Sequence, residues 1–377
     1  MTKSLTSFQS YSSVLAQPWL ASAPWDGIFI LSPALITSFV ALAFRSQLAE
    51  NSSIPVWAWV VLVLLVDVAH VYATLFRTYL DPEAFQKNRT LLLTVPISCL
   101  IVSCLLYSVN WMLFWTALAY LAVFHFIRQQ YGFVALYSRQ DPAVFQRFVW
   151  LDGLTIYMAT IYPLLFWHTH LPRNFNWFIE GDFVNSMPLI VAHIGLILYM
   201  VTASLYIAKE LILLKTTGFF NIPRNVLTLG TALSWWVGIV ALNSDLAFTM
   251  TNVVSHGVPY MALIWLYRRR FDSDDKSLTP IFDGKAWLIR ARNIAVTYAP
   301  VFVLSMALLA YLEEGLWDGF IWREHLHLFA PFSHLPVISD PTLLAILVPL
   351  LSLPQSTHYV LDGFIWRVKD RQSVWSA

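Results

Sequence analysis

The chain has 377 residues, of which 58% are hydrophobic and only 12% are charged. This composition is too apolar for an ordinary soluble protein, and the chain is too long for a single membrane span. The net charge is +1, and the basic residues are dispersed among predicted loops instead of forming a stripe, which argues against nucleic-acid binding.

Apolar segments of about 18 to 25 residues recur along the chain, the length that a helix needs to cross a hydrocarbon core of about 30 Å. The sequence therefore predicts an all-α, polytopic membrane helix bundle with about ten transmembrane helices. They cover 26–44, 55–77, 91–109, 111–137, 148–167, 187–208, 226–243, 246–267, 293–312 and 342–366. The segments 148–167 and 226–243 are the least apolar.

The distribution of Lys and Arg predicts the orientation of these helices. If the loops alternate between the two sides, 20 of the 23 basic residues share the side of the N-terminus, and only Arg45, Arg173 and Arg323 lie opposite. Because basic loops stay in the cytoplasm, both termini are predicted to be cytoplasmic, and the protein is expected in a bacterial inner membrane.

We predict one continuous transmembrane domain, 26–366, between a cytoplasmic N-terminal segment, 1–25, and a cytoplasmic tail, 367–377. Its longer connections are outer loops at 168–186 and 313–341 and a cytoplasmic loop at 268–290. Two similar heptapeptides, DPEAFQK at 81–87 and DPAVFQR at 141–147, each predict a short helix with Asp as N-cap and Pro at the first helical position.

Four predicted helices that descend toward the cytoplasm each carry one histidine: His70, His125, His256 and His358. Each histidine precedes the basic residue at its cytoplasmic helix end by 7 to 14 residues. That spacing corresponds to a depth of about 10–21 Å. Ionisable groups at membrane depth are costly and usually mark function. The alternative is that these side chains only hydrogen-bond helices together. We favour a metal site because all four lie at one level.

Polar side chains lie three or four residues from each histidine and therefore on the same helix face. They are Asp67 beside His70, Arg128 and Gln129 beside His125, Asn252 beside His256, and Gln355 and Asp362 beside His358. Asp67 and Asp362 could ligate a metal directly or accept the second ring N–H of a ligand, and Asn252 and Gln355 could also accept it. Histidine with carboxylate suits iron, zinc, copper or manganese.

With these four histidines on separate apolar helices, the chain resembles the histidine-rich integral-membrane iron enzymes, which include lipid desaturases, hydroxylases and the bacterial carotene dioxygenases. The resemblance is greater to the carotene dioxygenases, since the chain has no HxxxH or HxxHH cluster. It implies a mononuclear or dinuclear iron oxygenase that acts on a lipid or other apolar molecule, with dioxygen and an electron donor as partners. The site is expected to open to the cytoplasm, with His256 and Arg128 as candidate catalytic side chains.

Two other functions remain open. The segment SHGVPY at 255–260 is similar to the His-Gly stretch of membrane-bound O-acyltransferases, in which one intramembrane histidine acts as general base. A transporter or proton-coupled carrier could also use His and Asp pairs, although the outer halves of the helices are almost wholly apolar. A second group of histidines, in the outer loops, is expected to be solvated or interfacial: His168, His170, His325, His327 and His334.

Overall fold

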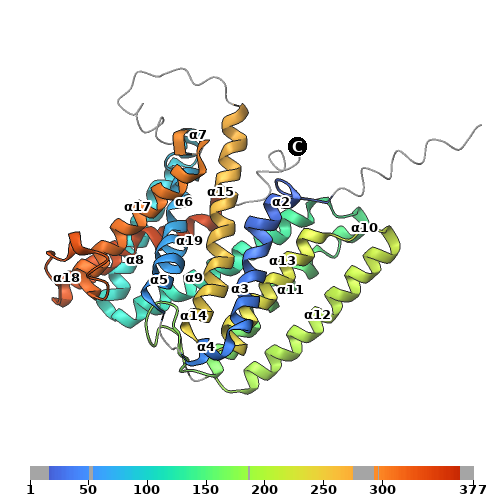
Figure 1. The fold of residues 1–377 in the computed structure, drawn as a ribbon, viewed down its shortest axis with the longest axis horizontal. Helices are drawn as coiled ribbons and strands as arrows, with labels where there is room; N and C mark the ends of the chain where they lie inside the picture. Colours follow the sequence, from blue (N-terminus) through green and yellow to red (C-terminus); the bar gives the residue numbers. More distant parts are fainter. Residues whose placement is uncertain (1–16, 51–53, 186, 275–292, 296, 366–377) are drawn as a thin grey trace, which may run out of the picture.

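The computed structural model describes residues 17–50, 54–185, 187–274, 293–295 and 297–365, and every regular element in these ranges is a helix (Figure 1). The all-α prediction is confirmed for this part of the chain. The predicted tail 367–377, most of the N-terminal segment and the loop 268–290 beyond residue 274 lie outside the described residues.

The helices cover the predicted segments, but several extend further: the helix predicted at 187–208 ends at Thr217, and the one predicted at 293–312 continues to Trp322, within the expected outer loop 313–341. Several contain π-helical turns, which are labelled η together with the short 3-10 helices. In chain order the principal elements are α2 (Ala23–Asp26), η1 (Gly27–Leu31), α3 (Ser32–Ala43), α4 (Arg45–Glu50), α5 (Val56–Ala58), η2 (Trp59–Val68), α6 (Ala69–Arg77), α7 (Pro82–Lys87), α8 (Arg89–Val109), α9 (Trp111–Tyr137), η3 (Ser138–Gln140), α10 (Ala143–Gln146), α11 (Val149–Thr169), α12 (Ile190–Thr217), α13 (Ile222–Trp235), η4 (Trp236–Ala241), α14 (Asp245–Phe248), η5 (Thr249–Val253), α15 (Val254–Asp274), α17 (Ala299–Trp317), η6 (Asp318–Trp322), η7 (Ala330–Phe332), α18 (Pro341–Leu351) and α19 (Leu353–Ile365).

Seven helices of the described chain are long and apolar enough to cross a membrane, and the pair α18 and α19, bent by 45°, makes an eighth if it forms one span. These helices indicate an integral membrane protein. The seven are 23–43, 56–77, 89–109, 111–140, 149–169, 190–217 and 299–322. The count of ten spans and the cytoplasmic position of both termini stay predictions.

The two remaining predicted segments, 226–243 and 246–267, are helical but less apolar. Their helices, α13 with η4 and α14 to α15, carry many side chains that are buried against other helices. A helix that packs against protein on most sides can carry polar groups that a lipid-facing helix cannot. By contrast, α8 and α12 expose long rows of leucine, isoleucine and valine. These rows are suited to contact with lipid.

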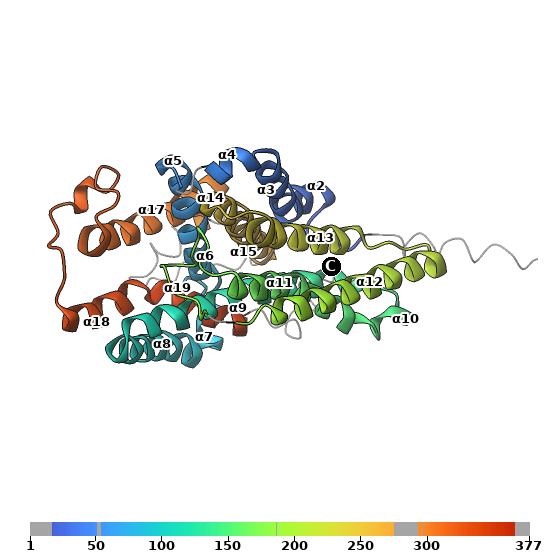
Figure 2. The same ribbon diagram turned by 90° about the horizontal axis from the view of Figure 1, so that it is seen from below.

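The helices that carry the four histidines meet in the middle of the molecule. In Figure 1, α6, α9, α15 and α19 lie between α12 at one edge and α17 and α18 at the other, and Figure 2 shows α9 and α19 beneath α6 and α15. Packing of α6 on α15, of α19 on α9 and of α19 on α6 brings together segments that are up to nearly 300 residues apart in the chain.

The two DP heptapeptides form short helices, and their aspartates accept hydrogen bonds from different partners. Asp81 accepts a hydrogen bond from Ala84 N at 3.1 Å and also pairs with Arg268 on α15. The predicted N-cap is confirmed for Asp81 and wrong for Asp141. The carboxylate of Asp141 instead accepts hydrogen bonds from Asn221 and Arg224 at the start of α13, so it does not cap α10.

Arg224 is fully buried in a network of charges between α11, α12 and α13. It also donates to Glu210 at 2.5 Å, while Lys209 pairs with Asp152 and lies 3.0 Å from Glu210. Burying an unpaired charge costs several kcal/mol, whereas a paired and hydrogen-bonded one is tolerated. The pairing explains how α11 accommodates Asp152, an acidic residue that is unusual in a membrane-spanning segment.

Candidate metal centre

Four histidines from four helices form one buried cluster. His70 on α6, His125 on α9, His256 on α15 and His358 on α19 each offer a ring nitrogen, and these atoms all lie within 4.8 Å of one another. The predicted convergence is therefore confirmed, and the cluster could hold a metal ion. It is the one such group of histidine, cysteine or carboxylate side chains in the described part of the chain.

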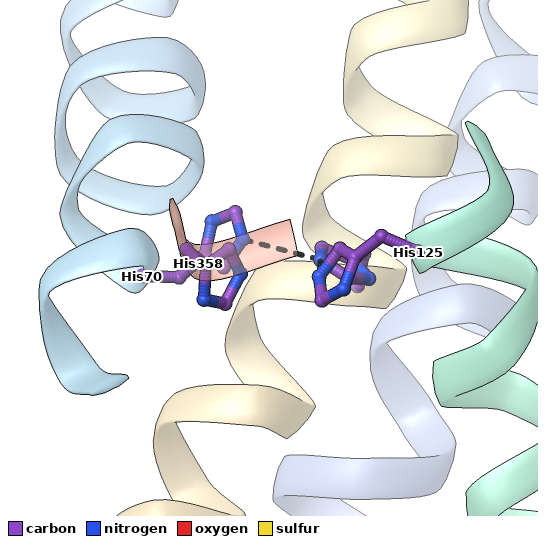
Figure 3. Close-up of side chains that lie close together, drawn as sticks. His70, His125 and His358 are labelled. Atoms are coloured by element: carbon purple, nitrogen blue, oxygen red, sulfur yellow. Dashed lines mark hydrogen bonds between the residues drawn. The ribbon is translucent and has the colours of Figure 1, made fainter. Parts of the chain in front are cut away.

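Three of the Nε2 atoms face each other at close range. His256 Nε2 lies 3.1 Å from His70 Nε2 and 3.2 Å from His125 Nε2. Figure 3 shows the rings of His70 and His358 on one side of the cluster and that of His125 on the other, with the ribbon of α15 behind them. Four nitrogens bound tetrahedrally to one metal at 2.0–2.1 Å would lie about 3.3 Å apart. The two distances from His256 Nε2 are close to that value, while the whole set of ligand atoms lies within 4.8 Å.

The Nδ1 atom of His70 points away from the cluster and hydrogen-bonds to Val66 O at 3.2 Å. Because a carbonyl oxygen only accepts, Nδ1 must carry the ring proton. In the neutral imidazole, Nε2 then presents its lone pair to the centre.

A chain of hydrogen bonds sets the tautomer of His358 in the same way. Tyr260 O–H donates to Asp362 Oδ1 at 2.7 Å, Tyr260 lies 2.8 Å from Thr74 Oγ1, and Thr74 Oγ1 lies 2.6 Å from His358 Nδ1. With Asp362 ionised, the tyrosine proton is committed to the carboxylate, so Thr74 donates to Tyr260. The threonine oxygen is then left to accept from His358 Nδ1–H. His358 Nε2, which is buried without a hydrogen-bond partner, keeps its lone pair.

Asp362 also orients His125, since its Oδ2 lies 3.5 Å from His125 Nδ1. One carboxylate thus faces the outer nitrogens of two histidines, directly at His125 and through Tyr260 and Thr74 at His358. Metal-bound histidines normally have such a partner on their second nitrogen. Asp362 is therefore placed to orient the rings of His125 and His358 through their outer nitrogens.

These tautomers leave at least three lone pairs directed into one buried space. His256 Nε2 can donate a proton to only one of its two neighbours, and its Nδ1 is buried without a hydrogen-bond partner. Lone pairs brought this close repel one another unless a cation lies among them. A metal ion fits this arrangement of donors better than a network of hydrogen bonds alone does.

The close approach of the helices depends on small and flat side chains next to the ligands. A Cβ on Gly257 would lie 2.7 Å from Val66 Cγ1 and 3.0 Å from Val66 O, so only glycine lets α15 approach η2 this closely. The ring of Phe126 stacks on His256 with centroids 3.6 Å apart. In addition, His70 and His256 each follow a π-helical segment, η2 and η5, a feature that is frequent at functional sites.

The structure places the other predicted site residues outside the four-nitrogen cluster. Asp67 Oδ1 lies 3.9 Å from His70 Nδ1, and its side chain is 35% exposed. Arg128 is exposed, and its contacts are with Tyr157, to which it donates at 2.7 Å, and with the ring of Tyr131. Because the Arg128 side chain is directed toward α11, the geometry gives it no contact with the histidines.

Two predicted partners of the ring nitrogens are wrong. Asn252 Oδ1 and His256 Nδ1 are both buried without a hydrogen-bond partner, so they do not bind each other, and His358 Nδ1 contacts Thr74 Oγ1 while Gln355 donates to Glu313 at 3.4 Å. The π-helical turns of η5 change the registration that an α-helix would give between Asn252 and His256. Thr74 and Tyr260, which the sequence analysis missed, lie on helices other than that of the histidine they serve.

The remaining histidines do not join the centre. His193 is exposed, His168 hydrogen-bonds to Tyr120 and to Leu164 O, and the ring of His325 lies against Trp59. In the described residues the outer histidines form no metal-binding group.

No protein-family model matches this chain, no curated protein matches it, and no solved structure matches it. The geometry of the four-histidine centre is therefore the main indication of function.

Proposed function

We propose that the protein is an integral-membrane oxidoreductase whose four histidines bind a metal, preferably iron, and which uses dioxygen to oxidise a lipid or another apolar molecule. The observation that carries the proposal is the convergence of four buried imidazoles with lone pairs directed inward. An all-imidazole donor set suits iron, copper or zinc. The membrane setting and the resemblance to histidine-rich iron enzymes favour iron.

When bound, the metal would supply the chemistry that activates oxygen. The protein would supply the ligands and a dry, shaped surrounding. His70, His125, His256 and His358 would hold the ion, and Asp362 would keep two of the rings oriented. Aromatic side chains, including Phe126, exclude water from the ligands and present an apolar surface.

The O-acyltransferase alternative has less support from the geometry. A general base needs one free nitrogen that can reach a hydroxyl group of the substrate. His256 is 1% exposed, and its Nε2 lies against two other imidazoles. The alternative also gives no role to the other three histidines.

Elemental analysis of detergent-purified protein tests the proposal. We expect near-stoichiometric iron in the wild type, and loss of that iron in His70→Ala, His125→Ala and His358→Ala. The exposed His193→Ala is the matched control and should keep the metal. Size-exclusion profiles identify any variant that has lost metal only because it does not fold.

Three results would contradict the oxygenase. Metal-free wild-type protein whose activity is abolished only by His256→Ala would favour acyl transfer. Metal-free protein that moves a solute across proteoliposomes in a pH-dependent manner would favour transport. Stoichiometric zinc without oxygen consumption would contradict oxygen chemistry while retaining the metal centre.

A further inference from the structure

A small cavity of about 20 Å³ lies next to the histidine cluster. A space of this size holds about one water-sized occupant. Its walls are formed by Asp67, Phe126, Trp177, Phe248, Asn252, Val253 and Tyr359. The rings of Trp177 and Phe248 pack against each other with centroids 5.6 Å apart and form an aromatic wall.

Three wall residues contact three different histidines. Asp67 lies 3.9 Å from His70, Phe126 stacks on His256, and the ring of Tyr359 lies 5.1 Å from that of His125. The cavity is therefore separated from the centre by a single layer of side chains.

Asp67 and Asn252 give the cavity two hydrogen-bond acceptors. An ionised carboxylate can accept hydrogen bonds but cannot donate them. The N–H groups of Asn252 donate to Phe248 O and Thr251 Oγ1. Its Oδ1 is buried with no hydrogen-bond partner, and the residue is 1% exposed. An unpaired buried acceptor is costly, so the occupant should be a cation or a hydrogen-bond donor.

The polar side chains of the wall favour a cation over an anion. Asp67 and Asn252 both contribute oxygen atoms, and Asn252 Oδ1 is buried without a hydrogen-bond partner. In the described residues neither Lys nor Arg pairs with Asp67. Carboxylate and amide oxygens are ligands that divalent cations commonly take in proteins.

We propose that this cavity is the entry site through which a divalent cation reaches the four histidines, with Asp67 and Asn252 as its transient ligands. The inference rests on the proposed metal centre. Oxygen ligands release a transition-metal ion readily to imidazoles, which bind it more strongly. Trp177 belongs to the loop between α11 and α12, so the entry site lies toward the predicted outer loop 168–186, whereas the sequence analysis expects an opening to the cytoplasm.

The rate of metal uptake tests the entry site. Purified full-length protein, stripped of metal with a chelator, is mixed with Co²⁺ in a stopped-flow instrument, and the visible absorbance of the bound cobalt is followed. We expect Asn252→Leu and Asp67→Asn to take up cobalt about 10-fold or more slowly than the wild type, and to reach the same final stoichiometry. The wild-type rate should fall with added salt, and Asp67→Asn should show a weaker salt dependence.

Glu180→Gln is the matched control, since Glu180 is an exposed carboxylate of the same loop as Trp177. Uptake at the wild-type rate by both variants would overturn the entry site. Loss of bound cobalt at equilibrium would also overturn it, because Asp67 and Asn252 would then be permanent ligands or structural supports. A wild-type protein that takes up no cobalt at all would instead contradict the metal centre itself.

Discussion

Replacing Thr74 by valine tests the hydrogen-bond chain that sets the tautomer of His358. The two side chains have nearly the same shape, so the substitution removes the hydroxyl between Tyr260 and His358 and little else. Without it the ring proton has no acceptor at Nδ1. In the variant the tautomer with the proton on Nε2 is favoured, and that proton must move to Nδ1 before Nε2 can bind a metal.

The expected loss follows from the contacts. A buried polar group left without its partner costs about 1–3 kcal/mol, and loss of an outer partner of a metal-bound histidine typically costs about 10- to 100-fold in affinity. We therefore expect Thr74→Val to weaken metal binding by about 10- to 100-fold while the overall fold is retained. Tyr260→Phe interrupts the same chain, so the double variant should lose less than the sum of the two single losses.

Competition with a chelator of known affinity measures the effect on purified protein. Thr78→Val is the matched control: Thr78 is also buried on the same stretch of chain, and its hydroxyl donates to Thr74 O at 2.7 Å without touching a histidine. If the two threonine variants bind metal equally well, the hydrogen-bond chain does not prepare His358 as a ligand, and our reasoning is refuted.

Two further substitutions test the packing around the centre. Gly257→Ala should lower stability by about 1–3 kcal/mol and weaken metal binding, because the new methyl group meets Val66, whereas Gly132→Ala, with open space at its Cβ, should do neither; thermal unfolding in detergent measures both. Arg224→Leu should destabilise the fold by about 3–5 kcal/mol, because it leaves Asp141 buried without a counter-charge. Recovery of stability in the double variant Arg224→Leu with Asp141→Leu would support this account, and a stable single variant would contradict it.

The helices and the common level of the four histidines can be predicted from the sequence because both depend on local patterns. A run of apolar residues predicts a helix wherever it occurs, and the distance of His70 from the basic end of its helix sets its depth. The structure confirms that four such helices bring their histidines together.

Contacts between helices could not be read in this way. Thr74 serves a histidine 284 residues away, and no periodicity in either segment shows which threonine will face which ring. Asn252 fails for a different reason, since the π-helical turns before His256 alter the spacing that defines a helix face. Arg224 resembles an ordinary basic residue at a helix end in the sequence, yet it is fully buried among carboxylates.

The paired aspartates of the two DP heptapeptides have a consequence for how the chain is assembled. Asp81 is synthesised 187 residues before its partner Arg268, and Asp141 is synthesised 83 residues before Arg224. Until those arginines are made, each carboxylate must stay in contact with water or take up a proton, because burial of the charge without a counter-charge is costly. We therefore expect the early helices to reach their final packing only after α13 and α15 supply the two arginines.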